Sequence, residues 1–228
     1  MVTEVAARSR EEIAARVAAD LAPGAVVNLG IGMPTLVAGH VPAGREVVFQ
    51  SENGVVGTRP LEPGEHPDPD LINAGKEPIG LVAGGSYLSH ADSFAMIRGG
   101  HVDVTVMGAF EVSAAGDLAN WSSGTDAIPA VGGAMDLAAG AATVVTMMSH
   151  LTGAGAPKLV ERCSLPLTAA GVVGRVYTDL AVLAVEGGEF VALELVPGLT
   201  FERLAAATAA ALRDGRDRVP ALLGERRR

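Results

Sequence analysis

The chain has 228 residues, of which 49% are apolar and 19% are charged, and its mean hydropathy is +0.33. This composition is typical of a well-packed globular protein and argues against long disordered stretches. The net charge of −9 argues against nucleic acid as a partner, and the single Cys163 leaves no disulfide framework or thiolate metal cage within the chain.

The first element that the sequence predicts is a helix near residue 10. Ser9 and Glu12 have the spacing of a capping box. Ile13, Val17 and Leu21 then follow at the period of one apolar helix face, and a Pro-Gly pair ends the segment. The region is charged from the start (RSREEIAAR, 8–16), so it lacks the apolar core of a signal peptide.

Seven short apolar runs alternate with helical stretches along the rest of the chain. The runs are rich in β-branched residues and several are apolar at consecutive positions, which is typical of strands covered on both faces. We therefore expect an α/β fold with an open, largely parallel sheet flanked by helices. The expected strands are 25–29, 46–50, 79–83, 102–107, 143–148, 179–185 and 189–195, and the expected helices are 34–40, 90–98, 133–140 and 201–213.

The domain organisation predicted from this pattern is simple. Residues 1–215 form one domain, and residues 216–228 form a basic C-terminal tail that we expect to be frayed. The most apolar stretch, 137–148, has about half the length of a membrane span. We therefore expect a cytoplasmic protein without a membrane partner.

Glycine-rich segments follow several of the predicted strands, at 28–34, 50–57, 83–86, 107–111 and 132–136. Ligands bind beyond the carboxyl ends of parallel strands, so the segments predict one shared pocket, although tight turns use glycine as well. A dinucleotide site is not expected. Thr35 stands where the fingerprint that starts at Gly30 needs its third glycine, and Val48 stands near the place of the acidic partner.

Glu52 is the sharpest chemical candidate. It follows a predicted strand and lies between Ser51 and Asn53. A partly desolvated carboxylate among amide donors can act as a general base or as a covalent nucleophile. The alternative interpretation is that Glu52 only caps the following turn.

Eight motifs stand out along the chain: NLGIGMPT (28–35), SENGVVG (51–57), DLINAGKE (70–77), DSFAMIRGGHVDVTVMGAFEVS (92–113), GDLANW (116–121), GGAMDL (132–137), CSLPLT (163–168) and TDLAVL (178–183). They resemble those of the B (beta) subunit of the family I 3-oxoacid CoA-transferases, which include the succinyl-CoA:3-oxoacid and 3-oxoadipate enzymes. The resemblance extends from about residue 9 to 213, in the same order and with similar spacing. It implies a CoA-transferase-like fold and an enzyme that moves CoA between carboxylic acids.

The resemblance implies a ping-pong mechanism through Glu52, with an acyl anhydride and then a Glu52–CoA thioester. It places Asn28 in the active site and puts Gly133 and Ala134 against the thioester, where their backbone N–H groups can stabilise a tetrahedral oxyanion. Lys76 becomes a candidate for contact with CoA, with a solvated loop lysine as the alternative. Coenzyme A is then a substrate, and no metal or redox cofactor is expected; the five histidines also lack a metal-binding spacing.

The same resemblance implies a partner, because the complete enzyme of this family needs an A-type subunit. We expect an A2B2 complex that takes CoA from an acyl-CoA, with succinyl-CoA as the expected donor, to 3-oxoadipate or acetoacetate. Two alternatives remain: a hydrolase-like relative that cleaves acyl-CoA, and a non-catalytic metabolite-binding subunit. The sequence departs from the family pattern at 122–131, which lacks the lysines of relatives, and at Ser149, where relatives carry glutamate.

Overall fold

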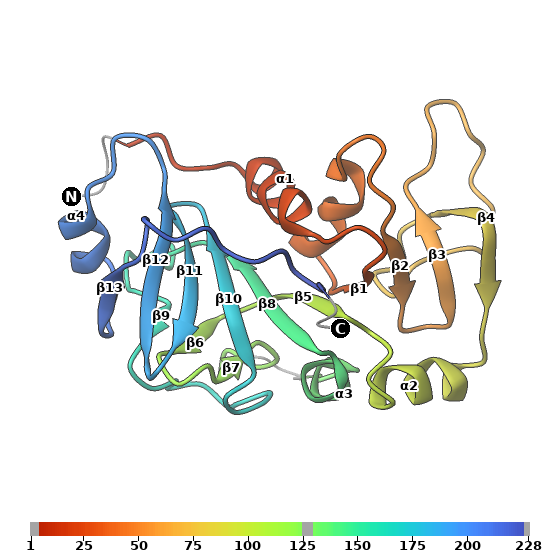
Figure 1. Ribbon diagram of the computed structural model, residues 1–228. Coiled ribbons are helices and arrows are strands. Elements are labelled where there is room, and N and C mark those ends of the chain that lie inside the picture. The colour runs from red at the N-terminus through yellow and green to blue at the C-terminus, as the bar shows by residue number, and fades with distance from the viewer. Residues whose placement is uncertain (1–4, 125–129, 226–228) are drawn as a thin grey trace.

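A computed structural model describes residues 5–124 and 130–225, which are built around a ten-stranded sheet of order β13-β12-β11-β10-β8-β5-β1-β2-β3-β4 (Figure 1). The central strands β10, β8, β5, β1 and β2 all run parallel, as predicted, and antiparallel strands flank them on both sides. The strands are β1 (Val26–Leu29), β2 (Val48–Ser51), β3 (Val55–Arg59), β4 (Gly80–Tyr87), β5 (Val104–Gly108), β6 (Glu111–Ser113), β7 (Leu118–Ala119), β8 (Thr143–Met148), β9 (Leu159–Val160), β10 (Val173–Thr178), β11 (Ala181–Glu186), β12 (Glu189–Leu195) and β13 (Leu212–Asp214).

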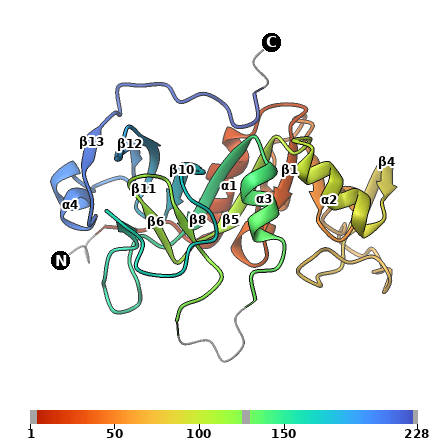
Figure 2. The same ribbon diagram turned by 90° about the horizontal axis from the view of Figure 1, so that it is seen from below.

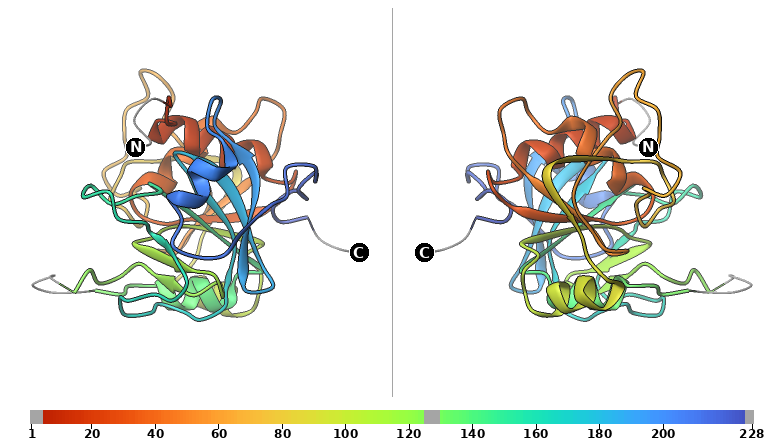
Figure 3. Two further views of the ribbon diagram at one scale, coloured as in Figure 1. Left: turned by 90° about the vertical axis from the view of Figure 1, so that its left-hand side faces the viewer. Right: turned by 90° about the vertical axis from the view of Figure 1, so that its right-hand side faces the viewer.

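Helices cover both faces of this sheet. The 3-10 helix η1 (Met33–His40) and α1 (Arg10–Asp20) lie on one side, and α2 (His90–Arg98) and α3 (Ala134–Gly140) lie on the other (Figures 1 and 3). The shorter helix α4 (Phe201–Ala206) packs beside the left-hand strands of Figure 1. No helix within residues 5–124 and 130–225 is both long and apolar enough to cross a bilayer.

Successive side chains along each strand point to opposite faces of the large sheet, so the hydrophobic core is divided into two parts. Val145 and Met147 of β8 pack toward α1, whereas Val144 and Met148 of the same strand pack toward α3. The side-chain period of two makes both faces apolar, so each strand can be covered on both sides. This explains why the sequence of these strands is almost continuously hydrophobic.

A second, three-stranded sheet of order β7-β6-β9 packs on the α3 side of the large sheet (Figure 2). Val112 of β6, Leu118 of β7 and Leu159 of β9 are fully buried there. The sheet places the segments after β5 and β8 next to each other, and this positions one wall of the site described below.

The seven expected strands correspond to β1, β2, β4, β5, β8, β11 and β12, whereas β3, β6, β7, β9, β10 and β13 were not expected. Of these six, β3 and β10 are the longest. Both contain a register irregularity at a glycine, Gly57 in β3 and Gly174 in β10, which interrupts the apolar run. The helix expected at 201–213 ends at Ala206. Its remaining residues pair with strands instead, because the Ala209 N–H donates to the Leu159 carbonyl at 2.9 Å.

The segment after β13 returns across the sheet toward α1. Leu223 is 3% exposed, and its backbone N–H and carbonyl bond to Asp20 and Ala22 at 2.7 and 2.8 Å. The Arg218 guanidinium bonds to the Glu186 carboxylate on β11. The tail that the sequence predicts to be frayed from residue 216 is therefore held against the domain as far as Leu223.

Candidate active site

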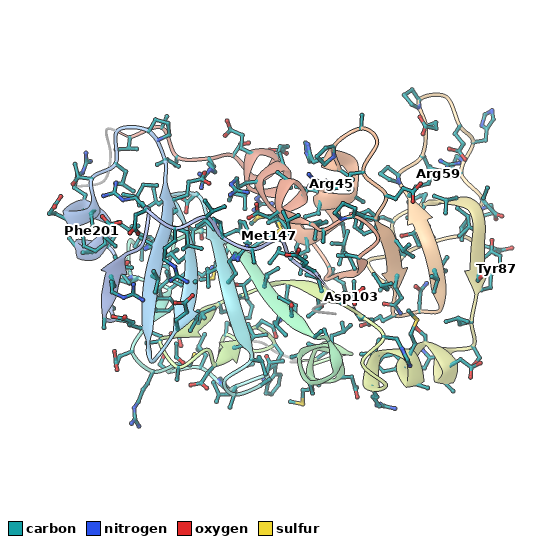
Figure 4. All side chains as sticks on the ribbon, viewed as in Figure 1. Arg45, Arg59, Tyr87, Asp103, Met147 and Phe201 are labelled. Atoms are coloured by element: carbon teal, nitrogen blue, oxygen red, sulfur yellow. The ribbon has the colours of Figure 1, made fainter. Side chains whose placement is uncertain are left out.

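A cleft of about 750 Å³ lies at the carboxyl ends of the central parallel strands. Strand order reverses there, because the chain moves from β1 to β2 in one direction and from β5 to β8 in the other. Such a reversal is where α/β sheets bind ligands. The cleft is lined by residues at or near the ends of β1, β5 and β8, namely Asn28, Gly108 and Met148. Met147, which is labelled in the middle of the sheet in Figure 4, also lines it.

Glu52 lies in the turn of the hairpin that joins β2 to β3. The Gly54 N–H donates to the Ser51 carbonyl at 2.9 Å, and Ser51 pairs with Val55 on the return strand. Gly54 has a φ of +112°, and a Cβ there would lie 2.3 Å from the Leu88 carbonyl oxygen. Only glycine fits this turn, so the sequence Glu-Asn-Gly has a structural cause besides its chemical one.

The Glu52 carboxylate lies against the backbone of Gly133, and both residues line the cleft. A Cβ on Gly133 would lie 2.3 Å from Glu52 Oε2, so a side chain at this position would displace the carboxylate. Burial raises the pKa of Glu52 above its ordinary value; His90 opposes this rise and Asp136 adds to it. A carboxylate that has lost part of its hydration is a stronger nucleophile than one in bulk water.

A buried chain of amides fixes Asn28 next to this turn. The Asn28 Nδ2 donates to the Gln50 Oε1 at 2.7 Å and to the Gln50 carbonyl at 3.2 Å. Gln50 in turn donates to the Ser93 Oγ of α2 at 2.8 Å. The Asn28 Oδ1 is buried and has no hydrogen-bond partner among the described residues, so it remains available to a donor group of a ligand.

The amino end of α3 forms the opposite wall. Gly133 is the N-cap residue, and its carbonyl accepts from the Leu137 N–H at 3.0 Å. The Ala134 N–H donates to the Val131 carbonyl at 3.2 Å. Within the described part of the chain the Gly133 N–H has no such partner, which leaves it able to donate to an oxygen beside Glu52.

The coenzyme A transferase family model matches residues 10–207, which contain this whole cleft apart from Arg8. That match covers well over half of the chain. This chain belongs to the coenzyme A transferase family. The fold and the enzyme class expected from the sequence motifs are therefore confirmed.

Related members of the coenzyme A transferase family are B subunits. The chain is 54% identical over 198 residues to the B subunit of the 3-oxoadipate CoA-transferase of Pseudomonas putida, covering 86% of this chain and 92% of the relative. It is 50% identical over 197 residues to the B subunit of the succinyl-CoA:3-ketoacid coenzyme A transferase of Helicobacter pylori, covering 86% and 94%. Among solved structures it is similar to the acyl-CoA transferase YdiF of Escherichia coli O157:H7, with a TM-score of 0.73 and 17% identity, over 91% of this chain and 42% of that longer chain.

The transferase cleft brings together four of the five site residues expected from the sequence: Asn28, Glu52, Gly133 and Ala134. Lys76 is exposed and does not line it. The loop of Lys76 nevertheless docks on the Glu52 turn, because the Ala74 N–H donates to the Ser51 Oγ at 2.9 Å and Ala74 itself lines the cleft. Gln50 was not singled out from the sequence, although a polar residue inside an apolar strand is a usable signal.

Two other titratable side chains, those of His150 and Cys163, are shifted in pKa by burial away from the Glu52 turn. His150 is fully buried between the Thr178 and Thr208 hydroxyls, at 3.1 Å from each, and burial lowers its pKa to about 4. Burial raises the pKa of the Cys163 thiol to about 11. No cluster of three or more potential metal ligands occurs in the part of the chain that the structure describes. Of the divergent segment 122–131, residues 125–129 lie outside the described residues.

Proposed function

We propose that this chain is the B subunit of an enzyme that moves CoA from succinyl-CoA to a 3-oxo acid, with Glu52 as the covalent nucleophile. The observation that carries the proposal is the position of the Glu52 carboxylate, which is half-buried at the mouth of the cleft and held against Gly133. The names of the relatives support both the donor and the acceptor class, since they include succinyl-CoA:3-ketoacid and 3-oxoadipate transferases.

The first half of the reaction exchanges a thioester for an anhydride. A Glu52 carboxylate oxygen attacks the thioester carbon of succinyl-CoA, the carbon–sulfur bond breaks, and CoA leaves as the thiolate. The thiolate then attacks the glutamyl carbonyl, which gives the Glu52–CoA thioester and releases succinate. A 3-oxo acid reverses these steps through its own carboxylate. Each step exchanges one activated acyl bond for another, so the reaction needs neither ATP nor a redox cofactor.

Residues around Glu52 could stabilise the negative charge that develops during these steps. The tetrahedral intermediates carry an oxyanion, and the Gly133 and Ala134 N–H groups lie at the wall where Glu52 reacts. Of the two, only Gly133 is without an internal partner among the described residues. Asn28 offers its free Oδ1 to an N–H or O–H of the substrate. We assign Lys76 to the CoA chain, whose route would follow the loop that carries Ala74.

A second subunit completes this enzyme. The relatives are named as B subunits, which implies an A-type partner, and we propose an A2B2 assembly. Coexpression with an A-type subunit, followed by size-exclusion chromatography with light scattering, tests this arrangement. A stable complex of the mass of two A and two B chains is expected; chains that elute separately would contradict it.

The covalent mechanism is tested by trapping. The complex is incubated with succinyl-CoA without an acceptor, reduced with borohydride, and digested for mass spectrometry. We expect the peptide that contains Glu52 to change in mass in the native protein and to stay unmodified in Glu52→Gln, which should also transfer CoA at least about a thousandfold more slowly. Glu46→Gln removes an exposed carboxylate away from the cleft and serves as the control.

The same incubation separates the two alternative functions. Rapid net hydrolysis of succinyl-CoA without an acceptor would indicate a hydrolase. Binding of succinyl-CoA without turnover, with Glu52→Gln indistinguishable from the native protein, would indicate a non-catalytic role in metabolite binding. Either result would overturn the proposed transfer chemistry.

A further inference from the structure

Three cations among the described residues line the active-site cleft, and their surroundings differ. Arg8 is ion-paired with Glu194, and Arg10 is exposed to solvent. Lys158 is half-buried and has no ion pair or side-chain hydrogen bond to any described residue. Of the three, Lys158 alone combines burial in the cleft with an unsatisfied ammonium group.

The backbone of Lys158 is fixed on both sides. Its N–H donates to the His150 carbonyl at 3.1 Å, and its carbonyl accepts from the Val112 N–H at 3.0 Å. Lys158 directly precedes β9, which pairs with β6 in the small sheet, and the His150 ring is buried. The lysine side chain therefore extends from a rigid base, unlike a lysine on a mobile surface loop.

Asp179 is the acidic residue that acts on Lys158 electrostatically, but the two residues form no close ion pair. Burial lowers the pKa of Lys158, and Asp179 opposes that effect. The Asp179 Oδ1 already accepts a hydrogen bond of 2.6 Å from the His150 backbone N–H. Asp179 lines the same cleft, but Lys158 forms no ion pair with any described residue, so its ammonium group remains able to pair with an anionic group of a ligand.

Lys158 and Glu52 approach the cleft from different strands of the sheet. The Lys158 N–H donates to the carbonyl of His150, two residues after the end of β8, and Glu52 follows β2. The strands β5 and β1 lie between β8 and β2. Three strand spacings of about 4.8 Å place the ends of β2 and β8 roughly 14 Å apart. Both residues line the same cleft of about 750 Å³, so one acyl group bound there can lie between them.

We propose that Lys158 binds the distal carboxylate of a dicarboxylic acyl group while Glu52 reacts at its other end. The proposal rests on the function proposed above and names the feature of the substrate that the cleft selects. Both a succinyl donor and a 3-oxoadipate acceptor carry such a carboxylate, whereas acetoacetate and a butanoyl donor do not. The side chain that binds the second carboxylate, Lys158, thus lies on this chain.

The test compares Lys158→Met and Lys158→Arg with Arg10→Met, which removes the exposed cation of the same cleft. Single-turnover rates are measured on the complex with succinyl-CoA and with butanoyl-CoA, which has the same chain length without the carboxylate. Lys158→Met should lose at least about 30-fold in kcat/KM with succinyl-CoA, the low end for removing one partner of a buried charge pair. With butanoyl-CoA its loss should be less than about threefold, and Lys158→Arg should keep part of the preference for succinyl-CoA.

Equal losses with both donors, no loss with either, or the same selective loss in Arg10→Met would overturn the proposal. Parallel rates with 3-oxoadipate and acetoacetate as acceptors show whether the donor, the acceptor or both use Lys158. The borohydride adduct at Glu52 keeps the two proposals apart. No adduct in the native protein contradicts the covalent mechanism, whereas a normal adduct with unchanged selectivity in Lys158→Met contradicts only the role of Lys158.

Discussion

Replacing Gly133 with alanine would place a methyl group where the Glu52 carboxylate now lies. The added Cβ would be 2.3 Å from Glu52 Oε2, 3.0 Å from Glu52 Cδ and 3.0 Å from Phe94 Cζ. Ordinary van der Waals contact begins at 3.4 Å, so the carboxylate must move by about 1 Å. A misplacement of that size in a reacting group costs about 100-fold in rate, and we expect this loss in kcat/KM.

The same substitution should leave the fold nearly unchanged. Gly133 has φ −83° and ψ 4°, which alanine can adopt, and the atom that must yield is the end of a flexible side chain. We expect the free energy of unfolding to change by less than about 1 kcal/mol, which corresponds to a few degrees in melting temperature. Activity and stability are thereby separated in one variant.

The assay measures kcat/KM for CoA transfer by the complex, together with the yield of borohydride-trapped Glu52. Gly39→Ala is the control, because a Cβ at Gly39 meets no atom within 4 Å. A fully assembled Gly133→Ala complex with native kcat/KM and native yield of the adduct would refute the reasoning. It would mean that the carboxylate reacts from a position away from Gly133.

Three further predictions concern stability and reactivity. The raised pKa of Glu52 means that, between its ordinary and its folded pKa, the folded chain holds a proton that the unfolded chain releases, so stability falls as pH rises. Glu52→Gln should therefore melt at a higher temperature than the native complex at pH 7.5 and at an equal temperature near pH 4; equal melting at both would contradict this. Tyr177→Phe removes the hydroxyl that donates to Asp20 Oδ2 at 2.6 Å in the core, and it should cost about 1–3 kcal/mol in chemical denaturation with kcat/KM within twofold of native. Cys163, with a pKa of about 11, should react with iodoacetamide at pH 8 roughly a hundredfold more slowly than free cysteine, and rapid labelling followed by mass spectrometry would disprove its burial.

The parts of the fold that were predicted correctly depend on local patterns. The capping box of Ser9 and Glu12 forms as expected, with hydrogen bonds of 3.1 and 2.7 Å, and α2 occupies the expected residues His90–Arg98. Strands with continuous apolar runs were found because burial on both faces leaves that signature in the sequence itself.

The errors lie where distant contacts override a local preference. The alanine-rich stretch after Ala206 has a high helix propensity, but Thr208 turns inward to contact His150 and Ala209 pairs with Leu159. Strand β10 contains Gly174 and Arg175, and Arg175 is stabilised by a hydrogen bond to the Ala221 carbonyl. These partners, His150, Leu159 and Ala221, are distant in sequence, so they could not be inferred from the residues that neighbour each segment.

The sequence alone determined the class of the protein and the positions of four of its five central parallel strands, and it predicts Glu52, Asn28, Gly133 and Ala134 as site residues. These follow from short motifs and from local hydrophobic period. Only the tertiary structure decided that Glu52 lies in a hairpin turn against Gly133, that Gln50 holds Asn28, and that Lys158 lines the cleft without an ion pair to a described residue. The physical reason is that burial, pairing and the unmet charge of a side chain depend on residues far away in sequence, which meet only when the sheet has formed.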